Sequence, residues 1–70
     1  MKYTVIEMQN GVVGANVWTF DEINQAEAKY HAVLSVAAVS AVKTHAAAIL
    51  NETGFLVRSQ CYTHDEVISA

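Results

Sequence analysis

The side chains that can do covalent or metal chemistry are few, and they are spread along the chain. The sequence holds three histidines, one cysteine and four basic residues, namely His31, His45, His64, Cys61, Lys2, Lys29, Lys43 and Arg58. A structural zinc site needs paired Cys or His ligands at short spacing twice over, and only Cys61 and His64 form such a pair. A nucleophilic cysteine needs an exposed, activated thiolate, whereas Cys61 alternates with Val57 on the expected core face of a strand. The sequence therefore predicts no catalytic residue, no metal site and no cofactor.

A second set of side chains suits non-covalent capture of a small anionic ligand. Its two cations can hold phosphate, its histidines and serine can donate hydrogen bonds, and its tyrosine ring can stack on a base. The set comprises Lys29, His31, Ser35, His45, Arg58 and Tyr62. Two members also have simpler roles: His31 can pair with Glu27 four residues earlier, and His45 can donate to the last carbonyls of a helix. We predict a ligand site at these residues, where subunits of an oligomer meet.

Two predicted hairpins that bracket one helix must position these side chains. The first hairpin pairs residues 2–9 with residues 12–18 around Asn10-Gly11, because both central positions of a type I′ turn need positive φ. Gly14 is a candidate bulge. The second hairpin pairs residues 45–50 with residues 55–62 around a turn at 51–54. Alanines at 46–48 also permit a longer helix, and the turn chemistry that follows favours the strand. The predicted fold class is α+β, in the order ββαββ.

The helix between the hairpins is long and rich in alanine. Thr19 and Glu22 match a capping box at its start, and we expect it to continue to about Val42, with Lys43 near its negative end. Spacing of 3.6 residues per turn predicts one apolar stripe for the chain's own sheet. That stripe comprises Ile23, Ala26, Tyr30, Val33, Leu34, Ala37 and Ala41.

A second apolar stripe lies on the opposite side of the same helix. It comprises Ala28, Ala32, Val36 and Val39. A chain of 70 residues has little other material to cover it, and a core of that size is marginal on its own. The stripe therefore predicts a symmetric homo-oligomer that forms through this surface and the edges of the sheet.

Composition limits the classes of partner. The net charge is −3 and the cations are scattered, which disfavours nucleic-acid binding as the function. The apolar run at 32–42 is shorter than the ~20 residues that cross a bilayer, and the first residues lack a signal-peptide core. One cysteine is consistent with a reducing compartment. We expect one cytoplasmic domain at 1–64 and a C-terminal tail at 65–70, with no membrane partner.

Five segments carry a resemblance to known sequences: KYTVIEMQ at 2–9, AEAKYH at 26–31, AAVS at 37–40, HAA at 45–47 and CYTH at 61–64. Together they resemble a family of very small, uncharacterised proteins encoded by phages and prophages of Firmicutes. The resemblance implies a protein of the host cell cytoplasm that counteracts bacterial defence by sequestering a nucleotide signal without enzymatic activity. Two alternatives remain open: direct inhibition of a host defence enzyme or nuclease by protein binding, and an accessory role in the virion or its assembly.

Overall fold

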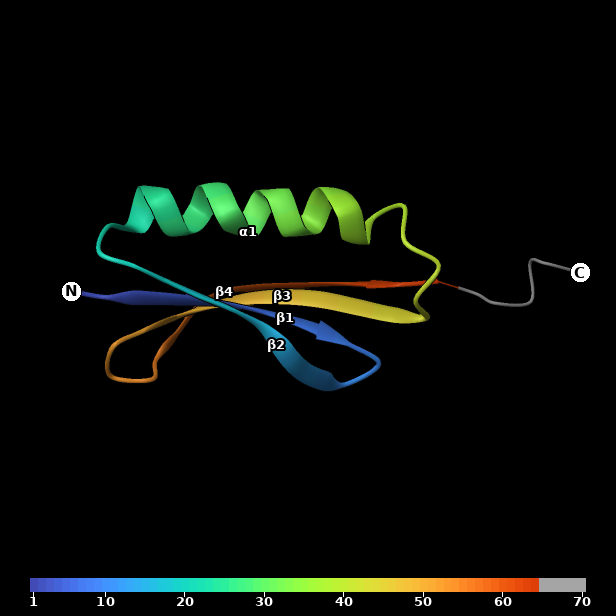
Figure 1. Ribbon diagram of the computed structural model, residues 1–70, viewed down its shortest axis with the longest axis horizontal. Helices are drawn as coiled ribbons and strands as arrows, with labels where there is room; N and C mark the ends of the chain where they lie inside the picture. The colour runs from blue at the N-terminus through green and yellow to red at the C-terminus, as the bar shows by residue number, and fades with distance from the viewer. Residues whose placement is uncertain (65–70) are drawn as a thin grey trace, which may run out of the picture.

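One helix packs on one face of an antiparallel sheet, which confirms the predicted α+β class. The computed structural model describes residues 1–64, apart from the side chain of Ala15. Its elements, in chain order, are β1 (Tyr3–Gln9), β2 (Val12–Phe20), α1 (Ile23–Ala37), β3 (Thr44–Asn51) and β4 (Leu56–Thr63) (Figure 1). The predicted tail at 65–70 lies outside the described residues.

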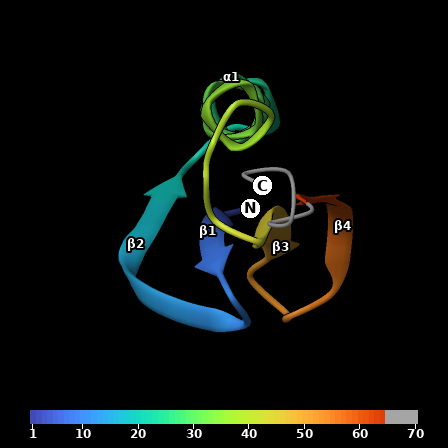
Figure 2. The same cartoon turned by 90° about the vertical axis from the view of Figure 1, so that its right-hand side faces the viewer.

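The sheet has four strands in the order β2-β1-β3-β4, and every neighbouring pair is antiparallel. The two hairpins are joined in the middle of the sheet, where β1 pairs with β3 (Figure 2). Asn10 and Gly11 have φ values of 55° and 82°, so the predicted turn with positive φ at both positions is confirmed. In the second turn, the Asn51 side chain accepts hydrogen bonds from the backbone N–H groups of Thr53 and Phe55.

The first hairpin contains the irregularity that Gly14 suggested. Ile6 pairs with Val17 and Met8 pairs with Val13, so Glu7 alone lies opposite residues 14–16. A bulge of this kind bends its strand and increases the local twist. The bend therefore lies directly opposite the one carboxylate within β1.

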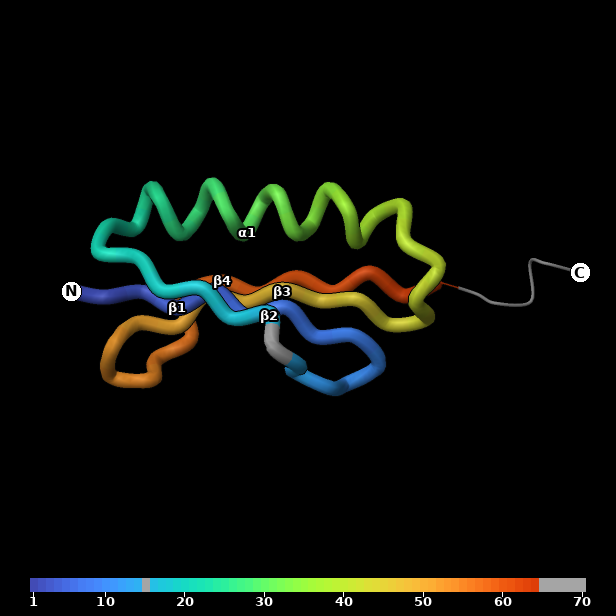
Figure 3. The backbone as a smooth tube through the Cα atoms, in the orientation of Figure 1, coloured from blue at the N-terminus to red at the C-terminus, as the bar shows by residue number. Residues whose placement is uncertain are grey.

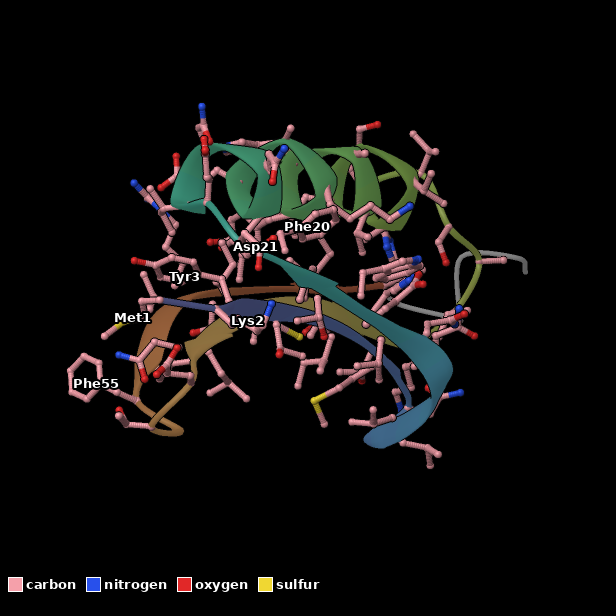
Figure 4. The ribbon with its side chains drawn as sticks, turned by 60° about the vertical axis from the view of Figure 1, so that its left-hand side comes forward. Met1, Lys2, Tyr3, Phe20, Asp21 and Phe55 are labelled. Carbon is pink, nitrogen blue, oxygen red and sulfur yellow. The ribbon has the colours of Figure 1, made fainter. Side chains whose placement is uncertain are left out.

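The helix begins later than the capping box predicted. Thr19 and Phe20 still belong to β2, where they pair with Thr4 and Tyr3. The residue at the N-cap is Glu22, and its side chain makes no capping hydrogen bond. The capping-box prediction is therefore wrong, because the backbone of Thr19 is extended in the ladder with β1. Beyond the strand, Asp21 forms an ion pair with Lys2 (Figure 4).

The helix also ends earlier than Val42, at Ala37. Val39 and Ser40 donate their N–H groups to the carbonyls three residues earlier, at 3.2 and 3.3 Å, which is the tighter pattern of a closing helix. The Ser40 hydroxyl then accepts the N–H of Val42 at 2.9 Å. Such local side-chain bonds compete with helix propagation. Ala41, predicted to face the sheet, is consequently exposed in the loop.

The core lies between α1 and the two central strands. Its buried residues are Val5, Ala26, Tyr30, Val33, Ala47 and Ile49. The predicted core face of β4 is inverted, because Arg58 pairs with buried Ile49 and Tyr62 pairs with buried His45. Residues in register share a face of the sheet, so Arg58 and Tyr62 face the helix, whereas Cys61 faces away from it and is exposed.

Candidate functional site

A cavity lies between the second half of α1 and the strands β1 and β2. Its volume is about 270 Å³, and it is lined by Glu7, Trp18, Lys29, Ala32, Val33 and Val36. Four of these residues come from successive turns of α1, which place their side chains on the flank of the helix above β1 and β2. The strands contribute one carboxylate and one large aromatic ring. The walls are therefore mainly apolar, with one anionic and one cationic group.

Lys29 and Trp18 are in direct contact at this cavity. The Lys29 ammonium lies 4.1 Å from the centroid of the Trp18 ring. A cation at this distance from the face of an indole is attracted by the ring quadrupole, which is worth about 0.5–1 kcal/mol at an exposed site. The contact holds the ammonium beside the cavity, and the flexible lysine stem permits it to move toward a ligand.

Glu7 is held in position by a buried histidine. His45 donates a hydrogen bond from Nε2 to the Glu7 carboxylate, and the side chains are 2% and 12% exposed. The pairing places these residues on the covered face of the sheet, because Glu7 and Gln9 on β1 lie opposite Ala47 and His45 on β3. His45 Nδ1 is buried and has no hydrogen-bond partner among the described residues. The carboxylate thus faces the cavity from a rigid support.

A second, smaller cavity adjoins the first at Glu7. Its volume is about 170 Å³, and its lining residues are Glu7, Gln9, Val12, Gly14 and Asn16. The bulge of β2 lies along this cavity, since Gly14 and Asn16 are both opposite Glu7. Glu7 therefore borders a hollow on each side, one apolar with Trp18 and one polar with amide side chains.

The other flank of the helix carries a different polar group. Arg58 of β4 donates from Nε to the Glu27 carboxylate at 2.9 Å. Tyr30 lies close by in the core, and burial raises the pKa of its phenol above the usual 10.0; the charge of Arg58 lowers it to a lesser extent, and Tyr62 adds a small increase. The ion pair joins this flank of the helix to β4.

The predicted ligand residues do not share one cavity within the chain. Lys29 lines the cavity beside Trp18, and His45 lies behind Glu7. Arg58 and Tyr62 lie on β4, at the other edge of the sheet. His31 is exposed on α1, with its ring in an edge contact with Tyr30 at 5.4 Å between centroids, and Ser35 is exposed on α1 as well.

The alternative role for His45 as a helix cap is wrong, because His64 performs it. His64 donates from Nε2 to the carbonyl of Ala37, the last residue of α1, at 2.8 Å. His45 is instead a strand residue on the covered face. Glu27, the expected partner of His31, is bonded to Arg58.

Sequence reasoning missed Glu7 as a site residue. A signal was present, because Glu7 shares its strand face with Tyr3 and Val5, which are expected core positions. A carboxylate on an apolar face requires a partner. His45 is likewise a polar residue on an apolar strand face, because it alternates with Ala47 and Ile49 within residues 45–50. Pairing these two polar residues with each other would have predicted their contact.

Comparison of the chain with family models, curated proteins and solved structures finds no match. Within residues 1–64, no helix reaches the length and apolar character that a membrane span requires. The same residues contain no group of three or more His, Cys, Asp or Glu side chains arranged to hold a metal ion.

Proposed function

We propose that this chain is a non-enzymatic binding protein that captures a small, anionic, nucleotide-like ligand in the cavity beside Glu7 and Trp18. The observation that carries the proposal is the combination of a fixed carboxylate, an indole ring and a mobile ammonium around one mainly apolar hollow. A nucleobase offers N–H donors to the carboxylate and a flat face to the indole. The ammonium of Lys29 then leaves the ring and binds a phosphate at the rim.

The size of the cavity supports a small ligand. Ligand cavities usually measure about 300–1,000 Å³, so a hollow of about 270 Å³ suits a single base rather than a dinucleotide. The sugar and phosphate would extend past Lys29 into solvent. In the phage setting that the resemblance implies, capture of a nucleotide signal in the host cytoplasm withdraws that signal from a defence system. The ligand proposal does not depend on self-association of the chain.

Absence of enzymatic activity is supported by where the reactive side chains lie. Cys61 is exposed on the face of the sheet opposite α1, whereas His45 is buried on the face covered by α1. A Cys–His nucleophile pair needs hydrogen-bond contact between the two side chains, and these two are separated by the sheet. His31 lies on the outer part of α1 and is exposed.

Isothermal titration calorimetry tests the ligand proposal. The purified chain is titrated with purine and pyrimidine mononucleotides, cyclic nucleotides and ADP-ribose. We expect binding of at least one of them, and Lys29→Gln weakens it about tenfold or more, because a charge-assisted hydrogen bond contributes about 1.5–3 kcal/mol. The matched control is Lys43→Gln, which removes an exposed cation outside the cavity and leaves affinity unchanged. Flat titrations of the folded protein across the panel contradict the proposal.

A second candidate function is direct inhibition of a host protein. It is favoured by the exposed apolar end of the molecule, where Met1 and Phe55 both point outward and are 65% and 68% exposed (Figure 4). Exposed aromatic side chains are frequent anchors of protein interfaces. Co-purification from host cells, with Phe55→Ser as the comparison, separates this function from ligand capture, since the variant leaves the cavity intact.

A further inference from the structure

The face of the sheet opposite α1 carries no charged side chain among the paired residues. Register assigns to this face Thr4, Ile6, Met8, Val13, Val17, Thr19, Ala46, Ala48, Leu50, Leu56, Ser59 and Cys61, and alternation with Arg58 adds Val57. The helix covers the other face only, and the backbone tube shows no other helix among residues 1–64 (Figure 3). Val13 and Val17 are 39% and 45% exposed here. We call this surface the open face.

The open face is large enough for a stable interface. Four strands at ~4.8 Å spacing, each about eight residues long at ~3.3 Å per residue, cover roughly 500 Å². Two such faces packed together bury about 1,000 Å², which is the area that a specific interface needs. The largest apolar patch on a soluble monomer measures about 300–600 Å² and often marks an interaction site, and the open face falls within this range.

In two cross-strand rows, the side chains of the open face divide into a bulky half and a small half. In one cross-strand row Val13 and Met8 are followed by Ala46 and Cys61. In the next row Val17 and Ile6 are followed by Ala48 and Ser59. In these two rows the bulky residues lie on β2 and β1, and the small residues lie on β3 and β4. The row that contains Thr19, Thr4 and Leu50 has the opposite order, with the bulky residue on β3. The small half forms a hollow of about 290 Å³.

We propose that two copies of the chain pack through their open faces around a two-fold axis that runs between the sheets, parallel to the strands. This axis places β1 over the partner's β3 and β2 over the partner's β4. Each cross-strand row then lies over the same row of the partner. Met8 then meets the partner's Ala46, and Ile6 meets the partner's Ala48. Val13 lies over the partner's Cys61, so each bulky half fills the small half of the other copy, as interdigitating sheets require.

A second copy fits this face better than an unrelated partner does. An isologous interface brings a surface against itself, so any charge near the axis would meet an identical charge, and none is present here. The core formed by the described residues is small: three of their seven buried hydrophobic residues are Ala26, Ala37 and Ala47. Cover is therefore needed whenever the chain is folded, and only another copy is always available. The ligand cavity lies on the other face, so either proposal can fail without the other.

Sedimentation equilibrium and a matched pair of variants test the dimer. The wild-type mass is expected at twice 7.6 kDa. Ala48→Arg places a charge in the middle of the open face and is expected to abolish the dimer. Val36→Arg places the same charge on the second stripe of α1, which is 57% exposed, and is expected to leave the dimer intact. A folded wild-type monomer at millimolar concentration overturns the proposal, and so does dissociation by Val36→Arg alone.

Cross-linking keeps the test valid if Ala48→Arg does not fold. The proposed axis places residue 13 near the partner's Cys61, whereas the same two residues within one chain are three strands, or about 14 Å, apart. A short bis-maleimide is therefore expected to link the Val13→Cys variant into covalent dimers. Val12→Cys, on the opposite face, is expected to give none, and the wild type is expected to give none. Dimers from Val12→Cys but not from Val13→Cys overturn the proposed packing.

Discussion

The two faces of the sheet use polar residues in opposite ways. The face under α1 holds Glu7, His45 and Arg58, and each of them has a charged or hydrogen-bonding partner on a neighbouring element. The open face holds no charged residue in any paired position, although the chain's own fold leaves it uncovered. Polar groups in a buried layer need hydrogen-bond or charged partners. An exposed apolar layer instead marks a surface that binds another molecule. The covered face is thus suited to recognition, and the open face to assembly.

The two polar pairs of the covered face also differ from each other. Glu7–His45 is buried near the centre of the sheet, whereas Arg58–Glu27 lies at its edge with side chains 52% and 33% exposed. A solvated ion pair contributes about 0–1 kcal/mol, because water screens it and ordering two long side chains costs entropy. A buried polar group that loses its partner costs about 1–3 kcal/mol. Loss of the Glu7–His45 pair at the cavity is therefore expected to cost more unfolding free energy than loss of the Arg58–Glu27 pair at β4.

One substitution made on both faces gives the sharpest test of the difference between them. Ile49→Ala removes a fully buried side chain from the covered face and is expected to lower the free energy of unfolding by about 2–5 kcal/mol. Ile6→Ala removes the same atoms from the open face and is expected to raise the dimer dissociation constant about tenfold or more, since a buried isoleucine contributes about 1.5–3 kcal/mol. Urea denaturation and sedimentation equilibrium measure the two effects. Equal losses of unfolding free energy, with an unchanged dissociation constant for Ile6→Ala, contradict the distinction.

The second test compares the two carboxylates of the covered face. Glu7→Ala leaves buried His45 without a hydrogen-bond partner within residues 1–64, because its Nδ1 has none there either, and is expected to cost about 1–3 kcal/mol of unfolding free energy. Glu27→Ala removes an exposed partner of Arg58 and is expected to cost less than about 1 kcal/mol. Urea denaturation of both variants provides the measurement. A larger loss for Glu27→Ala than for Glu7→Ala contradicts the assignment of the buried pair.

The turns and strands that depend on the preferences of a few neighbouring residues could be predicted from the sequence. The Asn10-Gly11 turn, the turn at 51–54 and the strands beside them depend on backbone preferences of a few residues, and the structure contains them. The predicted ends of the helix were wrong, because contacts with residues outside the helix determine where it begins and ends. Pairing of Thr19 with Thr4 kept the N-terminal residues extended, and the Ser40 hydroxyl closed the other end.

The site was predicted less well, because it depends on contacts between distant residues. Lys29 and His45 were recognised by type, but Glu7 lies 38 positions from His45, and their contact requires the central pairing of β1 with β3. That pairing joins the two hairpins and has no local signal. The face of β4 was inverted for a related reason: alternation shows which residues share a face, and register with β3 decides which face is covered.

The smallest expected effect is a pH dependence that originates on the covered face alone. Burial raises the pKa of Tyr30 above 10.0, so the unfolded chain loses this proton at lower pH than the folded chain does. The unfolded state therefore binds fewer protons between those two pKa values, and stability decreases as the pH rises through them. Urea denaturation at pH 9 and at pH 11 is expected to show this loss in the wild type and a smaller loss in Tyr30→Phe. Tyr62→Phe is the control, because Tyr62 lies at the edge strand, and it is expected to retain the wild-type loss. If Tyr30→Phe retains the full loss, the alkaline sensitivity does not arise from Tyr30.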